Sequence, residues 1–141
     1  MITFEIPGPV RGKGRPRFAR AGAFVRTYTD EKTESYEGLV KWTAKQAMGE
    51  RDLLDGALEV CIQVTKQTPK SMSQKKRAAA LAGRIRPTLK PDWDNIGKIV
   101  CDALNGIVYK DDSQIADGRV EKFYGERDGA IVIIQKIGED D

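Results

Sequence analysis

The sequence predicts an α+β fold, in which a mixed or antiparallel sheet packs against helices. Short segments with alternating apolar and polar residues indicate strands, and longer segments with apolar residues at three- and four-residue spacing indicate helices. These segments follow the order strand, helix, strand, helix, helix, strand, strand. The length of 141 residues, of which 40% are hydrophobic, fits one domain over residues 1–141.

The first three elements are supported by periodicity and by local composition. Ile2, Phe4 and Ile6 alternate with polar residues, as in a half-buried strand. The next segment carries six cations, no acid and several Gly and Pro, which predicts a basic loop or flap, with a short hairpin around Ala21-Gly22. Asp30 is a plausible N-cap for the helix that follows. We expect a strand at 2–6, the flap at 11–29 and a helix at 31–50.

The remaining elements are predicted from the same patterns of apolar residues and from turn residues at their ends. Gly83 and Asn105-Gly106 end the second and third helices. The last two strands read as an antiparallel pair that turns between Gly125 and Gly129, and the apolar run 131–134 indicates a strand buried on both faces. We expect strands at 57–66, 117–124 and 130–137 and helices at 71–82 and 94–104.

The composition excludes several classes of chemistry. The chain has no histidine, which excludes a Ser-His-Asp triad, a Cys-His pair and a histidine-ligated zinc site. Cys61 and Cys101 are far apart in the chain and indicate reduced thiols, with a disulfide as the alternative. No stretch has the pattern of a secretory signal or a membrane span, so we expect a cytoplasmic protein without a membrane partner.

Charge is distributed unevenly along the chain. The net charge is +3, but residues 1–90 carry 18 Lys and Arg against 9 Asp and Glu, whereas residues 91–141 carry 6 against 12. Two segments without an acid, 10–29 and 66–90, contain 14 of the 24 cations. This asymmetry predicts either a surface for a polyanion beside a metal site or charge complementarity within the fold.

The most informative stretch is acidic and surrounds the helix predicted at 94–104. Asp92 or Asp94 could be a simple N-cap of this helix. Lys98 lies four residues after Asp94, which also fits an ordinary surface ion pair. A turn after the helix could bring Asp111-Asp112 back toward its start, and converging carboxylates would favour Mg²⁺, which prefers oxygen ligands. The spacing alone leaves these interpretations open.

Three motifs carry a resemblance to a known family. The chain reads Pro91-Asp-Trp-Asp-Asn-Ile-Gly-Lys98, then Asp102-Ala-Leu-Asn-Gly106, then Asp111-Asp-Ser-Gln-Ile115. They resemble the Pro-Asp-x-Asp-Asn-Leu-x-Lys, Asp-Ala-Leu-Asn-Gly and Asp-Asp-x-Gln-Ile signature of the RusA family of Holliday junction resolvases, found in phage and prophage genomes, with Ile96 in place of Leu. The N-terminal strand, the basic segment and the basic helix resemble the family more weakly.

The resemblance implies a metal site without an organic cofactor. Asp92, Asp94 and Asp112 would ligate Mg²⁺, for which Mn²⁺ could substitute, and Asp111 is a further candidate ligand. Lys98 would act at the scissile phosphate, so the implied catalytic residues are Asp92, Asp94, Lys98 and Asp112. Asn95 and Asp102 would support these ligands or be structural. The family is homodimeric, so that two sites nick two opposed strands of a junction.

The basic segments supply candidates for contact with DNA phosphates, a largely electrostatic and salt-sensitive recognition. Phe18 and Phe24 are either anchors of the loop or wedges at the crossover, and we expect Trp42 and Trp93 to be packing residues. The DNA-binding candidates are Lys13, Arg15 and Arg17 in the flap and Lys75, Lys76 and Arg77 in the helix at 71–82.

The resulting hypothesis is a Mg²⁺-dependent, structure-specific DNA endonuclease of recombination and repair, which resolves four-way junctions by paired nicks in a homodimer. Two other interpretations stay open. One is a module that binds four-way or other branched DNA without cleavage, in which the acids are caps and ion pairs. The other is a Mg²⁺-dependent phosphohydrolase that acts on nucleotides.

Overall fold

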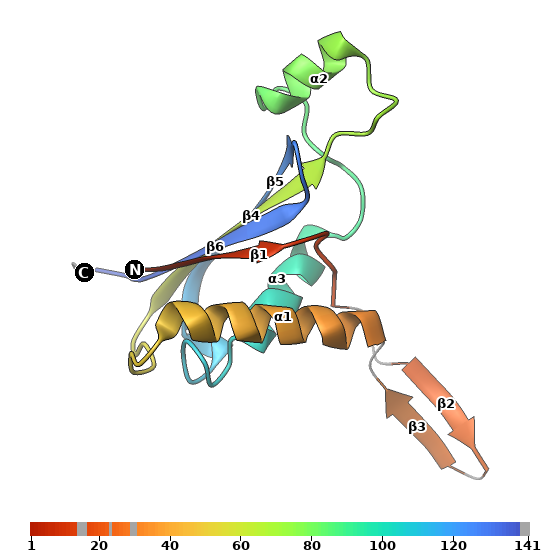
Figure 1. Cartoon of the computed structure of the whole chain (residues 1–141). Helices are drawn as coiled ribbons and strands as arrows, with labels where there is room; N and C mark the ends of the chain where they lie inside the picture. The colour runs from red at the N-terminus through yellow and green to blue at the C-terminus, as the bar shows by residue number, and fades with distance from the viewer. Residues whose placement is uncertain (14–16, 23, 29–30, 139–141) are drawn as a thin grey trace.

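The computed structural model describes residues 1–13, 17–22, 24–28 and 31–138. A four-stranded sheet forms its centre, and helices α1 and α3 lie against it (Figure 1). In chain order the elements are β1 (Ile2–Pro7), β2 (Arg17–Ala21), β3 (Phe24–Tyr28), α1 (Glu31–Met48), β4 (Leu58–Gln67), α2 (Gln74–Leu81), α3 (Trp93–Ala103), the short 3-10 helix η1 (Asp112–Gln114), β5 (Ile115–Gly125) and β6 (Gly129–Lys136).

The sheet is mixed and has the strand order β1-β6-β4-β5. β6 pairs antiparallel with β1 on one side and with β4 on the other, whereas β4 and β5 run parallel. Parallel neighbours need a long crossover connection, and the chain from α2 through α3 to η1 provides it. The predicted α+β class, with a mixed sheet packed against helices, is confirmed.

The predicted antiparallel pairing of the last two strands is wrong. β4 lies between β5 and β6 and hydrogen-bonds with both, so the turn at 126–128 spans the end of β4. The backbone N–H of Thr68 donates to the carbonyl of Gly125 (3.1 Å), and that of Gln67 donates to Asp128 Oδ1 (2.8 Å). A Cβ on Gly125 would clash with Thr65 of β4. A turn of this length is typical of a hairpin, and only long-range pairing reveals the intervening strand.

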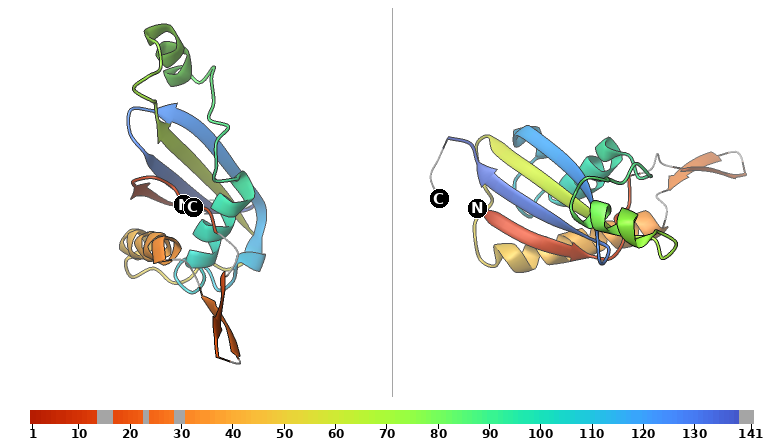
Figure 2. Two further views of the ribbon diagram at one scale, coloured as in Figure 1. Left: turned by 90° about the vertical axis from the view of Figure 1, so that its right-hand side faces the viewer. Right: turned by 90° about the horizontal axis from the view of Figure 1, so that it is seen from above.

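One face of the sheet is covered by the helices. Alternate residues of β4, from Leu58 to Val64, are buried, and the residues between them are half-buried. Figure 2 shows α1 and α3 side by side beneath the same face. The apolar run in β6 is therefore buried on one face only, because Ile131 is exposed and Ile133 half-buried. The prediction of a strand buried on both faces is wrong.

The helices bury one stripe each and leave both tryptophans in solvent. The helix predicted at 31–50 is confirmed as α1, which buries Tyr36 and Val40, and α3 buries Ile96 and Ile99. Trp42 and Trp93 are 62% and 65% exposed, so their prediction as packing residues is wrong. Among the described helices, none combines the length and the hydrophobicity that a membrane crossing requires.

Two parts extend from the body of the molecule (Figures 1 and 2). β2 and β3 form the hairpin predicted in the flap, with Gly22 at positive φ in its turn. α2 lies beyond the ends of β4 and β5, and its N-cap is Ser73, whose side chain accepts a hydrogen bond from the backbone N–H of Lys76. The predicted N-cap Asp30 lies outside the described residues.

Candidate active site

The polar face of α3 carries most of the predicted site. Its apolar residues face the sheet and α1, whereas Asp94, Lys98 and Asp102 follow at four-residue intervals and lie in one row on the other side. Asp112, from η1, extends this row next to Asp102. We call Asp94, Lys98, Asp102 and Asp112 the acidic face of α3.

Asp92 occupies the N-cap position of α3 but does not act as a side-chain cap. Its backbone is extended, and its carboxylate makes no capping hydrogen bond to the helix. Asp94 lies in the first turn, where the helix dipole favours a negative charge. The interpretation of Asp92 as an N-cap and nothing more therefore lacks the hydrogen bond that it requires.

The chain after α3 turns back through a loop that its own side chains hold in place. Gly106 adopts a positive φ of 79°, and its N–H donates to the carbonyl of Tyr109 (2.7 Å). The buried Tyr109 hydroxyl donates to the carbonyl of Cys101 on α3 (2.6 Å). Gln114 donates its side-chain amide protons to the carbonyls of Leu54 and Gly56. These contacts place η1 beside the last turns of α3.

The structure separates the two adjacent acids of η1. Asp111 is the N-cap, and its carboxylate accepts a hydrogen bond from the Ser113 N–H (3.0 Å), which lowers the pKa of Asp111. Asp112 instead contacts Asp102. The hydrogen bond between the two carboxyl groups raises the pKa of Asp112, and partial burial and the charges of Asp102 and Asp111 act in the same direction. Asp112, not Asp111, is thus the η1 acid on the acidic face.

Asp102 is the most highly connected group of the site. Its Oδ2 lies 3.3 Å from the Lys98 ammonium and 3.5 Å from that of Lys13. Partial burial acts to raise the pKa of Asp102, but the hydrogen bond with Asp112 and the two lysines outweigh it and lower the pKa. Asp102 therefore holds Lys98 while it contacts Asp112.

Lys13 ties the root of the flap to this network. Its ammonium also pairs with Glu37 of α1 at 2.8 Å, and the hydrogen bond to Glu37 raises the pKa of Lys13. Its backbone N–H donates to the carbonyl of Asn95 (3.0 Å). A Cβ on Gly12 would lie 2.9 Å from Pro91 Cβ, so the backbone passes close to the Pro-Asp motif only because residue 12 is glycine.

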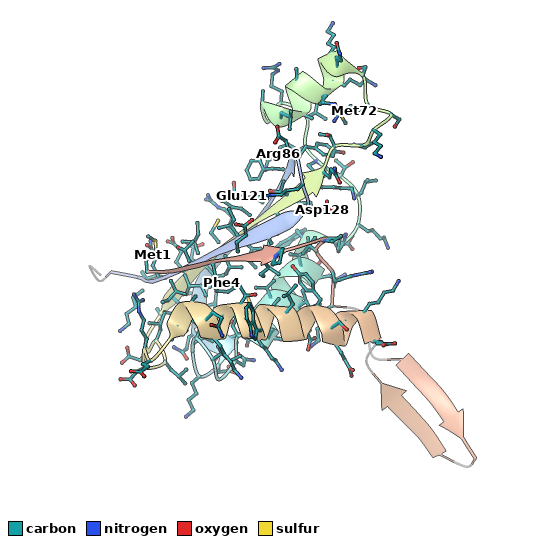
Figure 3. The ribbon with its side chains drawn as sticks, viewed as in Figure 1. Met1, Phe4, Met72, Arg86, Glu121 and Asp128 are labelled. Carbon is teal, nitrogen blue, oxygen red and sulfur yellow. The ribbon has the colours of Figure 1, made fainter. Side chains whose placement is uncertain are left out.

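Asp92 and Asp94 face a second environment, an open pocket of about 590 Å³. Its lining also includes Trp93, Pro87, Val120 and three charged residues, of which Arg86 and Glu121 are labelled in Figure 3. Lys122 donates from Nζ to the carbonyl of Leu89 (2.9 Å). Arg86 donates to the carbonyl of Lys122, and its guanidinium lies 3.9 Å from the centre of the Phe123 ring. Each cation is thus held by a backbone carbonyl and lines the same pocket as the two carboxylates.

The donors fit the chemistry of magnesium, although they do not all converge. Every candidate ligand is a carboxylate, and the contact between Asp102 and Asp112 is one that a cation or a shared proton stabilises. Among the described residues, no group of three acids or cysteines could hold a metal ion. Asp94 and Asp102 are two helical turns apart, about 12 Å along α3. The role of Asp92, Asp94 and Asp112 as a shared set of Mg²⁺ ligands stays a prediction.

The candidates for DNA contact differ in whether their side chains are exposed or already contact other groups of the protein. Lys75 and Lys76 are exposed on α2. Arg77 is half-buried and donates to Thr68 Oγ1 (2.8 Å) and to the carbonyl of Pro69 (3.1 Å), which anchors α2 to the end of β4. Lys13 already pairs with two carboxylates. The side chains of Arg15, Arg17, Phe18 and Phe24 lie outside the described part of the structure.

Sequence reasoning missed several residues of the site. Lys13 was predicted as a contact for DNA, and nothing in the sequence pairs it with Glu37, which lies on another element. Gln114 belongs to the third motif, and Tyr109 lies just before it. Both hold the return loop through hydrogen bonds to backbone carbonyls that the sequence does not reveal. Trp93 was predicted as a packing residue, which the structure contradicts. Its exposure is a property of the folded chain.

Two comparisons with known proteins show what this chain is similar to. A family profile described as endodeoxyribonuclease RusA matches residues 7–135, which include every described element except the first five residues of β1 and the last residue of β6. The chain is also similar to the uncharacterized protein YqaN of Bacillus subtilis (strain 168). The two are 37% identical over 138 residues, which cover 96% of each chain.

Proposed function

This chain belongs to the RusA family of endodeoxyribonucleases, and on that premise we propose that it is a Mg²⁺-dependent, homodimeric nuclease that resolves four-way DNA junctions. The observation that supports the proposal most directly is the position of the acidic face. Its charges lie at the root of the basic flap, because Lys13 pairs with Asp102 of this face at 3.5 Å. Groups suited to phosphodiester hydrolysis thus lie beside a segment suited to DNA phosphates.

The basic segments would bind the arms of the junction. Lys75 and Lys76 stand on a helix that extends from the body, where an arm of DNA can reach them without meeting the sheet (Figure 1). The flap carries five further cations over 11–26 besides Lys13. Phosphate contacts of this kind bind the backbone without reading its sequence, and their strength falls as salt is raised.

The acidic face, together with Asp92, would carry out hydrolysis. Asp92, Asp94 and Asp112 are the residues proposed to hold Mg²⁺, which when bound activates water and stabilises charge on a phosphoryl group. Lys98 is 61% exposed and is held by Asp102, so its ammonium can donate to a non-bridging oxygen of the scissile phosphate. Asp102 orients that ammonium and limits its side-chain entropy.

A homodimer follows from the substrate rather than from any contact within this chain. A four-way junction is resolved by two cuts in opposed strands, and each chain has one acidic face. Two copies related by a two-fold axis would present two such faces to a substrate with similar symmetry.

Cleavage of a synthetic four-way junction, with and without Mg²⁺, tests the proposal. We expect Asp94→Asn to retain junction binding and to lose about 10²- to 10³-fold in cleavage rate, because it removes a charge proposed to hold the metal. Asp52→Asn, which neutralises an exposed acid in the loop before β4, is the matched control and should cleave normally.

Three results would overturn the proposal. Full cleavage by Asp94→Asn would remove the acidic face from the reaction. Junction binding by the wild type without nicking in Mg²⁺ or Mn²⁺ would indicate a binding module. Hydrolysis of nucleotides but not of junctions would indicate a different phosphohydrolase.

A further inference from the structure

Trp93 occupies a position that packing does not explain. It is the first residue of α3, stands between Asp92 and Asp94, and is 65% exposed. A single exposed apolar side chain is common on protein surfaces and by itself means little. Trp42, on α1, is equally exposed and serves as the comparison.

What distinguishes Trp93 is the pocket that it lines. The same pocket contains the carboxylates of Asp92 and Asp94 and has an apolar part made by Pro87 and Val120. Trp42 has no part in this pocket. An aromatic ring, an apolar wall and the two carboxylates proposed as metal ligands thus line one open cavity of about 590 Å³.

Two cations complete the pocket and are held in place by the backbone. Arg86 donates to the carbonyl of Lys122 and stacks on Phe123. Lys122 donates to the carbonyl of Leu89. Each keeps its positive charge while one of its donors is used, so each can still attract a phosphate. The pocket therefore combines an aromatic face and two cations with three carboxylates, those of Asp92, Asp94 and Glu121. An aromatic face and cations are the groups that bind unpaired bases and their phosphates.

We propose that Trp93 stacks on an unpaired nucleobase next to the scissile phosphate and so positions the strand that is cut. The inference rests on the proposed nuclease function. Bases within a duplex already stack on their neighbours, whereas bases at a junction crossover can leave the stack at smaller cost. The exposed indole then offers a face to such a base, while Asp92 and Asp94, its neighbours in sequence, lie toward the adjacent phosphate.

Fluorescence tests the contact directly. In Trp42→Phe, the only tryptophan is Trp93, and in Trp93→Phe the only one is Trp42. We expect a four-way junction, added in EDTA to prevent cleavage, to quench the Trp93 emission strongly and to leave the Trp42 emission unchanged. A linear duplex of the same length should quench Trp93 much less at equal saturation. Equal quenching of both tryptophans, or no quenching of Trp93, would overturn the proposal.

Cleavage kinetics test the role. Loss of one aromatic stacking contact should slow junction cleavage about 5- to 100-fold in Trp93→Ala, and Trp93→Phe should recover most of the rate because it keeps an aromatic face. Trp42→Ala should stay within about twofold of the wild type. Thermal unfolding of each variant identifies any loss of fold, and Trp93→Phe keeps the test valid if Trp93→Ala unfolds.

The outcomes separate this inference from the function on which it rests. If the wild type does not cleave junctions, the proposed function fails. If the wild type cleaves and Trp93→Ala cleaves equally well, only the stacking role fails. A blue shift of Trp93 emission with protein concentration in the absence of DNA would place the indole in an interface between copies and would overturn the proposal.

Discussion

The two ends of α3 carry acids in different states. At the C-terminal end, Asp102 is paired with Lys98 and Lys13 and contacts Asp112. At the N-terminal end, Asp92 makes no capping hydrogen bond, and it and Asp94 line an open pocket. The acids at one end are thus held by contacts within the protein, and those at the other end line a pocket that is open to solvent. One helix can carry both groups of acids because its polar face extends over two turns from Asp94 to Asp102, while its apolar face packs in the core.

This difference indicates that the two ends of α3 have different roles in the proposed site. The paired end fixes Lys98 and the return loop before substrate arrives, so that less freedom is lost on binding. The open end leaves carboxylates, an indole and two cations accessible from solvent. Substitutions at the two ends should therefore differ in whether they affect catalysis, DNA contact or stability.

The largest effect on cleavage is expected for Asp112, compared with its neighbour Asp111. Asp112→Asn should lower junction cleavage about 10²- to 10³-fold, because it removes the charge of a proposed metal ligand. Asp111→Asn is the matched control, since an asparagine can also cap η1. It should retain cleavage within about threefold. Similar losses in both variants would contradict the separation of the two acids.

An intermediate effect is expected for Lys98. Lys98→Ala should slow cleavage about 10- to 10²-fold while junction binding holds, because one charge contact to the phosphate is lost during the reaction. The measurement is single-turnover cleavage with saturating protein, alongside a binding titration. Unchanged cleavage would remove Lys98 from the mechanism, and weakened binding with normal cleavage would make it a ground-state contact.

The smallest effect is expected at the root of the flap. Lys13→Met should lower the free energy of unfolding by about 1 kcal/mol, since it breaks two partly exposed ion pairs and leaves Glu37 without its lysine. Glu37→Gln in the same background should then cost less than it does alone, as measured by denaturant unfolding. Strict additivity of the two substitutions would contradict the pairing. Because Lys13 also holds Asp102, a loss of cleavage of a few-fold is expected as well.

The sequence predicted the secondary structure and the chemistry more fully than the order in which the strands pair in the sheet. Alternation in β1 and β4 and helical spacing in α1 and α3 gave elements whose bounds agree with the structure within a few residues. The motifs around Asp92, Asp94 and Lys98 indicated the family. Strand pairing could not be predicted in the same way, because the short turn between β5 and β6 resembles a hairpin although β4 lies between them.

In the site, too, contacts between segments distant in the chain could not be predicted from the sequence. Four-residue spacing correctly placed Asp94 and Lys98 on one side of the helix, because neighbours on a helix follow from its geometry. Spacing did not show that Asp112 would meet Asp102 rather than Asp92 or Asp94. That outcome depends on the direction of the return loop, which the buried Tyr109 and the side chain of Gln114 determine through contacts with distant backbone.

By itself, the sequence determined which segments become strands or helices, the absence of histidine chemistry and the acidic signature of the family. These properties depend on residue type and on spacings of a few residues, which are the same in any fold. The tertiary structure alone decided the insertion of β4 between β5 and β6, the attachment of Lys13 to Glu37 and Asp102, and the exposure of Trp93. Each of these joins segments that are distant in the chain, so its free energy depends on the packing of the whole domain.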